Sequence, residues 1–248
     1  MSVEYRIGDA VSELGSMPDE SASLIHLDDA WARPKRDDEY SDAGKYGVNY
    51  PTHELNTTRR LLDICKDILR PGGWLIADAD DWLLPRLVNY LRDEWGDVAE
   101  SYSGGGFRRV GGVTSTTKSG TVDRSTPGQY LSNGGYPVVF AHKGETDRRT
   151  AESARQIAER QRNDFGWTAV KPLSPYEVWL DALLERGDHV VEPCAGTAPA
   201  AIAAERLWGD GARVTCIDIE ADAREAYRRR REAELGDDQP TLSEAADD

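Results

Sequence analysis

The sequence predicts an α/β protein, and three observations lead to this class. Short apolar runs of the length that strands need alternate along the chain with segments of helical spacing. Two strand–turn–helix–strand units, at residues 5–31 and 188–220, end in acids, as do units that hold a ligand at the edge of a parallel sheet. The 248 residues are enough for one α/β domain with an insertion.

The N-terminal unit combines two short strands with a group of acids. Strands are predicted over 5–7 and 23–27, with a helix over 11–17 between them. The second strand runs into Asp28-Asp29-Ala30-Trp31. A carboxylate and an aromatic ring at this spacing suit a planar amine, because the carboxylate accepts from its NH₂ group and the ring stacks on its face. The plainer alternative is a strand end with helix-capping or turn-forming aspartates.

The middle of the chain continues the alternation. Helices are predicted over 53–70, 82–95, 151–163 and 176–184, and a strand over 74–77. Asp78, Asp80 and Asp81 follow that strand, where three acids could bind a metal ion. Helix capping is the preferred interpretation, and no metal is expected.

The C-terminal unit is the more informative of the two. Val190-Val191 predicts a strand buried on both faces, and Gly196 lets the backbone turn close to a ligand. The alanine-rich segment 198–208 is predicted to be helical, and the next strand covers 214–217. Asp218 then lies about 20 residues beyond the loop, where an acid can accept both hydroxyls of a ribose. The alternative is an ordinary turn with a surface acid.

The loop and its acids favour a cationic ribonucleoside as the ligand. The loop lacks the G-x-G-x-x-G pattern of dinucleotide-binding proteins. Glu192, at the strand end, places a negative charge where a phosphate would be repelled. S-adenosylmethionine carries both a positive charge and a ribose, so the sequence predicts it as the cofactor.

Taken together, the segments resemble the DNA methyltransferases that modify adenine N6 or cytosine N4, in the permuted group whose catalytic motif precedes the cofactor motif. The resemblance covers residues 3–232 and rests most on the order of the segments. It implies a Rossmann-like three-layer sandwich with circularly permuted motifs and an inserted target-recognition region. The matching segments are 7–10, 17–25, 28–31, 69–76, 136–143, 171–172, 192–197 and 217–220.

The resemblance also implies roles for individual residues. Asp28 and the backbone carbonyl of Asp29 would accept the hydrogens of the target amine, and Trp31 would stack on the flipped base. An aspartate at position 28 favours adenine N6 over cytosine N4. Asp218 would hold the ribose of the cofactor and Asp9 its adenine. The implied cofactor-binding residues are Asp9, Ala10, Lys171, Glu192, Pro193, Ala195, Gly196, Thr197, Asp218 and Ile219.

The catalytic tetrapeptide departs from the family pattern. Asp29 and Ala30 replace two prolines that stiffen the turn, and Asp29 brings a second carboxylate close to Asp28. A catalytically silent DNA-binding or regulatory protein with the same fold is therefore one alternative. A methyltransferase that acts on RNA or on a small amine is another.

Residues 101–135 are rich in Gly, Ser, Thr and Arg, which predicts a long, flexible, locally basic insert with a candidate role in DNA recognition. The candidate phosphate contacts there are Arg108, Arg109, Lys118 and Arg124, and a disordered surface loop is the alternative. A second basic group, Arg33, Lys35 and Arg36, predicts a mobile loop over the flipped base. The expected organisation is a catalytic half over 1–100, the insert, a cofactor half over 136–236 and a disordered acidic tail over 237–248.

The charge and cysteine content predict the setting. A net charge of −15 with few lysines is typical of a halophile, where salt screens self-repulsion, so we expect the cytoplasm of a halophilic archaeon or its virus. Three scattered cysteines indicate buried thiols in a reducing compartment. No apolar run is long enough to span a membrane. The expected partner is DNA, in a restriction-modification setting, and a homodimer stays open.

Overall fold

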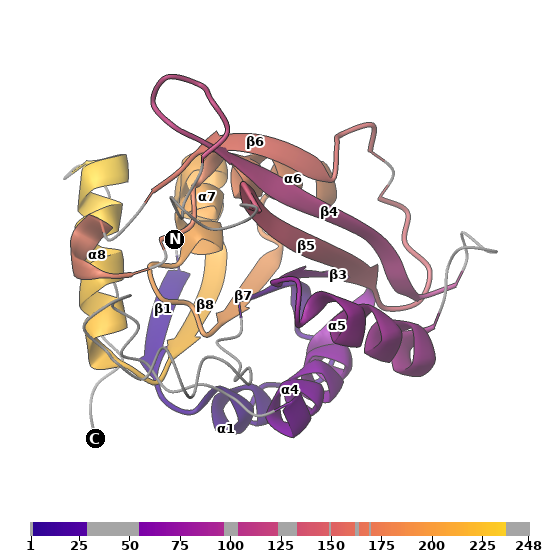
Figure 1. Cartoon of the computed structure of the whole chain (residues 1–248). Coiled ribbons are helices and arrows are strands. Elements are labelled where there is room, and N and C mark those ends of the chain that lie inside the picture. The colour runs from indigo at the N-terminus through magenta and orange to yellow at the C-terminus, as the bar shows by residue number, and fades with distance from the viewer. Residues whose placement is uncertain are drawn as a thin grey trace.

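Eight strands form one mixed sheet in the computed structural model of this chain, in the order β1-β8-β7-β2-β3-β5-β4-β6 (Figure 1). The structure describes residues 2–28, 55–96, 104–123, 133–148, 150–161, 164–168 and 170–236. Strands β1, β8, β7, β2 and β3 run parallel, whereas β5 is antiparallel to β3 and β4. The strand bounds are β1 Ser2–Ile7, β2 Ala22–Leu27, β3 Leu69–Asp78, β4 Gly106–Thr116, β5 Gly135–His142, β6 Arg155–Glu159, β7 His189–Pro193 and β8 Arg213–Asp218. The predicted α/β class is confirmed.

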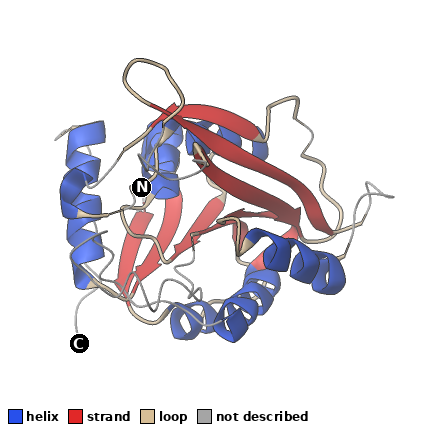
Figure 2. Ribbon diagram, viewed as in Figure 1, coloured by secondary structure: helices blue, strands red, loops and turns tan. Residues whose placement is uncertain are grey.

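Helices cover both faces of the sheet and make three layers (Figures 1 and 2). Helices α6, α7 and α8 pack on one face and α1, α4 and α5 on the other, and each side has its own apolar cluster. The predicted three-layer sandwich is therefore confirmed. The helix bounds are α1 Ala10–Gly15, α4 Leu55–Ile68, α5 Leu84–Tyr90 with a π turn η1 Leu91–Trp95, α6 Ser174–Leu183, α7 Pro199–Trp208 and α8 Ala221–Leu235, with short 3-10 turns η2 Asp164–Gly166 and η3 Gly209–Gly211.

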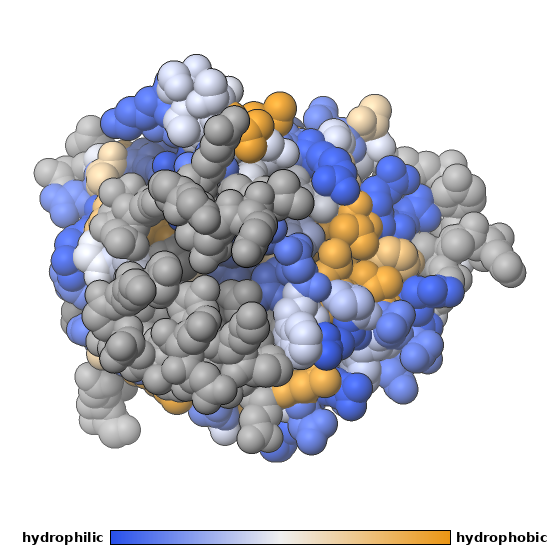
Figure 3. All heavy atoms as spheres, viewed as in Figure 1, coloured by the Kyte–Doolittle hydropathy of each residue, from blue (hydrophilic) through white to orange (hydrophobic). Residues whose placement is uncertain are grey.

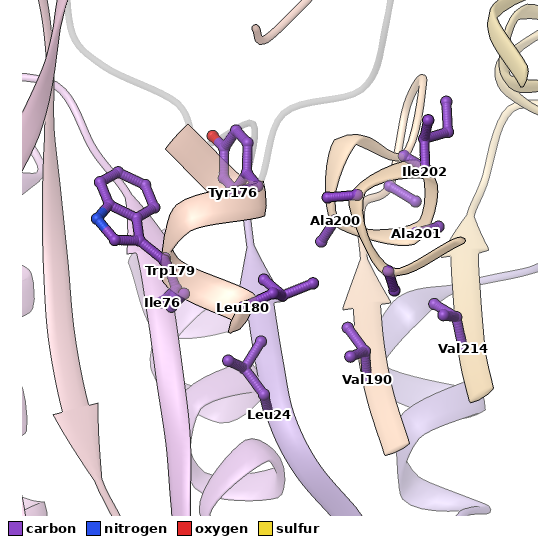
Figure 4. Packing of buried hydrophobic residues seen from close by; sticks show 14 of the residues in the cluster. Leu24, Ile76, Tyr176, Trp179, Leu180, Val190, Ala200, Ala201, Ile202 and Val214 are labelled. Carbon is purple, nitrogen blue, oxygen red and sulfur yellow. The ribbon is translucent and has the colours of Figure 1, made fainter. Parts of the chain in front are cut away.

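The two helices nearest the middle of the sheet pack in different ways (Figure 4). From α6, the large side chains of Tyr176, Trp179 and Leu180 cover Leu24 of β2 and Ile76 of β3. Helix α7 presents mainly alanine to β7 and β8, so its backbone can approach those strands closely. The start of α7 is thereby held against the ends of β7 and β8.

Strands β7 and β2 form the switch point of the sheet. From β7 the chain continues to β8 on one side, and from β2 it continues to β3 on the other. The two strands share the register pairs Leu24↔Val190 and Ile25↔Val191. Loops that leave adjacent strands in opposite directions open a crevice at their carboxyl ends, which is where ligands bind in such sheets.

Residues 106–116 form strand β4, so the expectation of a flexible insert is wrong for this part of 101–135. The glycines here serve close strand packing. A Cβ atom on Gly111 would lie 2.0 Å from the backbone oxygen of Ala154, and one on Gly135 would lie 1.8 Å from that of Val113. Glycine-rich composition indicated flexibility, but the backbones need these glycines in order to approach one another.

The helix predicted over 151–163 is also wrong, because residues 155–159 form the edge strand β6. Its backbone pairs in parallel with β4, from Gly112↔Arg155 to Thr116↔Glu159. Only Ala158 of the strand is buried, so its charged side chains stay in solvent. Pairing with an available sheet edge outweighs the helical preference of a short polar segment.

The contact between η1 and β4 depends on Gly106. Its φ is +116°, and an added Cβ would lie 1.7 Å from the backbone oxygen of Gly96. Gly120 has φ +78° but has no atom within 4 Å of such a Cβ. We expect Gly106→Ala to lower the free energy of unfolding by at least about 2 kcal/mol more than Gly120→Ala does in urea denaturation. Equal losses would show that the backbone contact does not matter.

Hydrophilic residues dominate the described surface in the view of Figure 3, in keeping with a chain in which 30% of residues are charged. Hydrophobic residues form small groups among them. Within the described ranges, no helix combines the length and apolar character that crossing a membrane demands.

Candidate active site

The turn between β7 and α7, residues 194–198, has an unusual backbone. Cys194, Gly196 and Ala198 have φ values of +56°, +51° and +48°. For the two non-glycine residues this conformation costs on the order of 1 kcal/mol each. Hydrogen bonds from Ala195 N to Ile217 O at 2.9 Å and from the Tyr5 hydroxyl to Gly196 O at 2.7 Å hold it in place. We refer to residues 194–198 as the β7–α7 loop.

Asp218, at the end of β8, is joined to this loop. One carboxylate oxygen accepts from Gly196 N at 2.8 Å and the other from Glu220 N at 2.9 Å. Burial raises the pKa of Asp218, and these backbone hydrogen bonds oppose the rise. The residue is 8% exposed, so it can still meet a ligand at the loop. Next to it, Ile219 is largely exposed.

Glu192, the fourth residue of β7, fills the N-terminus of α7. Its carboxylate accepts from Ala200 N at 3.1 Å and from Ala201 N at 3.0 Å, and only 1% of the residue is exposed. A helix N-terminus of this kind is where dinucleotide-binding proteins place a phosphate. Because a carboxylate already occupies the position, the arrangement disfavours a phosphate there.

His26 of β2 lies between two buried acids. Its Nδ1 is 2.7 Å from Glu192 Oε1, and its Nε2 is 3.5 Å from Asp78 Oδ2. Burial lowers the pKa of His26, but hydrogen bonds and attraction from the two carboxylates outweigh it and raise the pKa to about 10. The ring is therefore an imidazolium at neutral pH. It joins the capping acid of α7 to the end of β3.

Asp78, the last residue of β3, connects His26 to Lys171. Its Oδ2 accepts from Tyr176 Oη at 2.6 Å and from Lys171 Nζ at 3.1 Å. Burial acts to raise the pKa of Asp78, but Lys171 and His26 outweigh it and hold the pKa well below its usual range. The ammonium of Lys171 also lies 4.2 Å from the ring centroid of Tyr136. Burial opposes its charge, yet the neighbouring carboxylates raise the pKa of Lys171.

Asp28, just beyond the end of β2, is the outermost member of this group. Both of its carboxylate oxygens lie 3.1 Å from Lys171 Nζ. Its side chain is 38% exposed, whereas that of Asp78 is 1% exposed. Five charged side chains thus form a continuous series, which we name the buried ion network: Glu192, His26, Asp78, Lys171 and Asp28.

Arg230 connects this network to the β7–α7 loop. The guanidinium, on α8, donates to the Thr197 hydroxyl at 2.9 Å and to the backbone oxygen of Lys171 at 2.6 Å. Burial lowers the pKa of Arg230 to about 10. The whole Arg230 residue is buried. The loop and the segment carrying Lys171 are therefore positioned by one side chain.

The structure brings most of the predicted site residues to one edge of the sheet. Asp28, Lys171, Glu192, Asp218 and the β7–α7 loop meet around the switch point. Asp9 joins them because Gly8 N donates to Asp218 O at 2.9 Å. The Asp9 carboxylate accepts from Ser12 N at 3.0 Å and so caps α1, where Ala10 is buried. Pro193 is buried as the last residue of β7.

Other predicted residues lie elsewhere or outside the described ranges. Arg108 and Arg109 are on β4, and Lys118 is exposed in the turn that follows it. Asp80 caps the helical turn before α5, accepting from Trp82 N and Leu83 N at 2.8 Å, as the capping interpretation predicted. The residues outside the described ranges are Asp29, Trp31, Arg33, Lys35, Arg36 and Arg124.

Sequence reasoning missed several members of the site. His26 is the one ionisable residue of β2, which is a weak signal for a buried charge. For Asp78 the helix-capping interpretation is wrong, because its carboxylate accepts from Tyr176 and Lys171. No local pattern marks Arg230, because it sits among other arginines on a charged helix. By sequence, Tyr136 and Tyr176 are marked only as the first residues of the segment 136–143 and of the predicted helix 176–184.

Comparisons with known proteins establish the fold. No protein-family model matches the chain, and no curated protein matches it. A candidate DNA modification methylase from Thermus thermophilus, solved with S-adenosyl-L-methionine, superposes with a TM-score of 0.67 at 17% identity over 99% of both chains.

Two further solved structures are similar. M1.HpyAVI in complex with SAM has a TM-score of 0.63 at 11% identity, over 92% of this chain and 98% of that one. The PvuII DNA methyltransferase, cytosine-N4-specific, has a TM-score of 0.65 at 15% identity, over 96% of this chain and 94% of that one. The chain therefore has a Rossmann-like methyltransferase fold, as predicted.

Proposed function

We propose that the protein transfers a methyl group from S-adenosylmethionine to an exocyclic amine of a DNA base. The proposed amine is adenine N6, and cytosine N4 is the alternative. One observation carries the proposal: a partly exposed carboxylate, Asp28, and the β7–α7 loop stand at the ends of adjacent strands at the switch point. The similar solved structures include a cytosine-N4 methyltransferase and two proteins bound to this cofactor. Their likeness supports the same reaction class.

The residues around the β7–α7 loop suit this cofactor. Gly196 gives the backbone room beside Trp167, whose Nε1 would lie 3.0 Å from an added Cβ. Asp218 offers a carboxylate with acceptor capacity beyond its hydrogen bonds from the loop and from Glu220 N, as a ribose diol requires. Glu192 occupies the phosphate position, which favours a ligand without phosphate. When bound, the cofactor supplies an electrophilic methyl group on a sulfonium.

The chain's own contribution is to orient the amine. Asp28 would accept a hydrogen of the NH₂ group and point the nitrogen lone pair toward the β7–α7 loop. Burial raises the pKa of Asp28, and the ammonium of Lys171 opposes this rise and so favours the ionised acceptor. Asp29 and Trp31 are proposed to complete the site through a carbonyl acceptor and a stacking ring. For the DNA, we propose phosphate contacts from Arg33, Lys35, Arg36, Arg108, Arg109, Lys118 and Arg124.

Nucleoside mass spectrometry tests the proposal directly. Unmethylated duplex DNA is incubated with the protein and cofactor in buffers of low and molar salt, digested and analysed. We expect N6-methyladenine. Detection of N4-methylcytosine instead would show that cytosine N4, and not adenine N6, is the target. If duplex DNA yields no methylated base in either buffer, methyl transfer to DNA is contradicted. Methylated nucleosides found only in a parallel incubation with RNA would point to an RNA methyltransferase.

One observation favours the silent alternative. Lys171 contacts both oxygens of Asp28, so an incoming amine must share this acceptor with an ammonium. If the ion pair does not open, the protein would bind DNA without modifying it. Gel shifts on duplex DNA that persist where no methylated base forms would support this function.

Replacing Gly196 should weaken cofactor binding. In Gly196→Ala the Cβ would stand 3.0 Å from Trp167 Nε1 at a φ of +51°, so the loop or the indole must shift. We expect a tenfold or greater loss of affinity for S-adenosylmethionine in calorimetry, which is about 1.4 kcal/mol. Gly187→Ala is the matched control, because its φ is +92° and its surroundings are open. Unchanged affinity in Gly196→Ala would remove the loop from the cofactor site.

A further inference from the structure

A cavity lies away from the switch point, between α6 and strand β4. Its volume is about 670 Å³, within the range of roughly 300–1,000 Å³ typical of small-molecule sites. Its lining includes three arginines and three aromatic residues: Arg108, Arg109, Arg148, Trp74, Phe140 and Trp179. We refer to it as the arginine pocket.

A β-bulge places two of the arginines on the same wall. Phe107 pairs with Ala141 and Arg109 pairs with Phe140, so Arg108 is an extra residue in β4. Phe107 packs with the cluster on the α4 side, whereas Arg108 and Arg109 both line the pocket on the α6 side. In a regular strand, Phe107 and Arg109 would share one face. The bulge therefore turns a second guanidinium into the pocket.

The opposite wall adds a third cation. Arg148 lines the pocket and is oriented by Glu185, whose Oε1 is 2.9 Å from its Nη1. Glu152 is the one acid among the described residues that line the cavity. With Glu185 included, three guanidinium groups stand against two carboxylates among the described side chains at the cavity, and this net positive balance in a protein of net charge −15 favours an anion.

The floor of the pocket is aromatic. Trp74, Phe140 and Trp179 belong to the apolar core and expose 6%, 5% and 3% of their surface. Trp179 projects from the side of α6 away from α7, as Figure 4 shows. Its indole N–H donates to Ser153 O at 3.1 Å, and that of Trp74 donates to Thr146 Oγ1 at 3.2 Å. With their polar atoms bonded, the small exposed parts of these rings offer a ligand only apolar surface.

We propose that the arginine pocket binds a nucleotide, with its phosphate on the guanidinium groups and its base against the aromatic floor. Guanidinium groups form paired hydrogen bonds with phosphate, and bases pack well on aromatic rings. The nucleotide is free in solution, whereas a strand held by the same two arginines would be the DNA contact proposed above. The proposal does not depend on methyl transfer, because the pocket is lined by α6, β3, β4, β5 and the segment before β6, and not by the β7–α7 loop.

Calorimetry of the full chain tests this, with adenosine monophosphate and a five-nucleotide oligodeoxyadenylate as separate probes. Saturating S-adenosylmethionine is present throughout, so that binding at the β7–α7 loop does not contribute. We expect the double variant Arg108→Gln/Arg109→Gln to bind the probe at least tenfold more weakly than the wild type. Arg155→Gln, an exposed arginine on the neighbouring strand β6, should bind it as the wild type does.

The two probes distinguish a free nucleotide from a DNA strand, and their results can be told apart from a failure of the methylation assay. Binding of the monophosphate that depends on the two arginines supports a free nucleotide. Binding of the oligonucleotide alone, with the same dependence, is what the DNA phosphate contacts proposed above would give, and it overturns the nucleotide pocket. Binding of neither probe, or equal binding in the double variant, overturns the proposal. The methylation assay is a separate measurement, so its failure leaves this one readable.

Discussion

Replacing Asp28 by alanine is expected to lower the rate of methyl transfer about 1,000-fold or more, while affinity for S-adenosylmethionine is unchanged. Asp28 is the exposed end of the buried ion network, and the proposed mechanism makes its carboxylate the acceptor for the target amine. A positioned acceptor or base contributes typically about 10²–10⁴-fold to a rate. The proposed cofactor residues at the ends of β7 and β8, Glu192 and Asp218, do not contact Asp28 and stay in place in this variant.

The measurement is single-turnover methylation of duplex DNA, with cofactor affinity from calorimetry. Asp28→Asn keeps the shape but lacks the charge, so it should be nearly as slow as the alanine variant. Asp81→Ala is the matched control, because Asp81 is exposed at the same edge of the sheet, beyond β3. Methylation by Asp28→Ala at the wild-type rate would rule out the proposed role of this carboxylate.

Replacing His26 by leucine is expected to give the largest loss of stability. The substitution removes the cation between Glu192 and Asp78, both 1% exposed at the side chain, and leaves the two acids facing each other. Breaking a buried ion pair by removing one partner costs about 3–5 kcal/mol. Urea denaturation at pH 7 measures the difference. A loss below about 1 kcal/mol would show that the imidazolium is not what holds the acids together.

The same residue predicts a pH dependence. The pKa of His26 is raised from 6.5 to about 10 on folding, so the folded protein holds this proton more tightly. Its contribution is fully present below about pH 6.5 and is lost as the pH rises toward 10. The wild type should therefore lose stability relative to His26→Leu across this window. His189 provides the opposite case, because burial lowers its pKa and its contribution is lost as the pH falls.

The outline of the fold could be predicted because apolar runs mark buried parallel strands directly. Val190-Val191 and the run before Asp28 identified β7 and β2, and their acidic ends identified the edge that carries the site. Glycine content misled at β4, because glycine marks both flexible loops and close strand packing. The polar β6 misled because its partner, not its own sequence, determines its conformation.

The site could be predicted only in part, for a related reason. Asp28 and Asp218 stand at strand ends, where position alone suggests chemistry. The position of Lys171 beside Asp28 and Asp78 depends on how α6 and its leading segment pack, which no local pattern contains. The carboxylate of Glu192 was expected at a ligand, but its contacts on α7 and His26 come from the tertiary fold.

The buried ion network has a consequence for the order in which the chain folds. His26 and Glu192 are 166 positions apart, and Asp28 and Lys171 are 143 apart. At synthesis rates of about 5–20 residues per second, the N-terminal acids and imidazole emerge on the order of ten seconds before their partners. Burying these charges alone is unfavourable, so β2 should stay exposed until the C-terminal third of the chain arrives. The protein is then expected to fold late and in one step rather than half by half during translation.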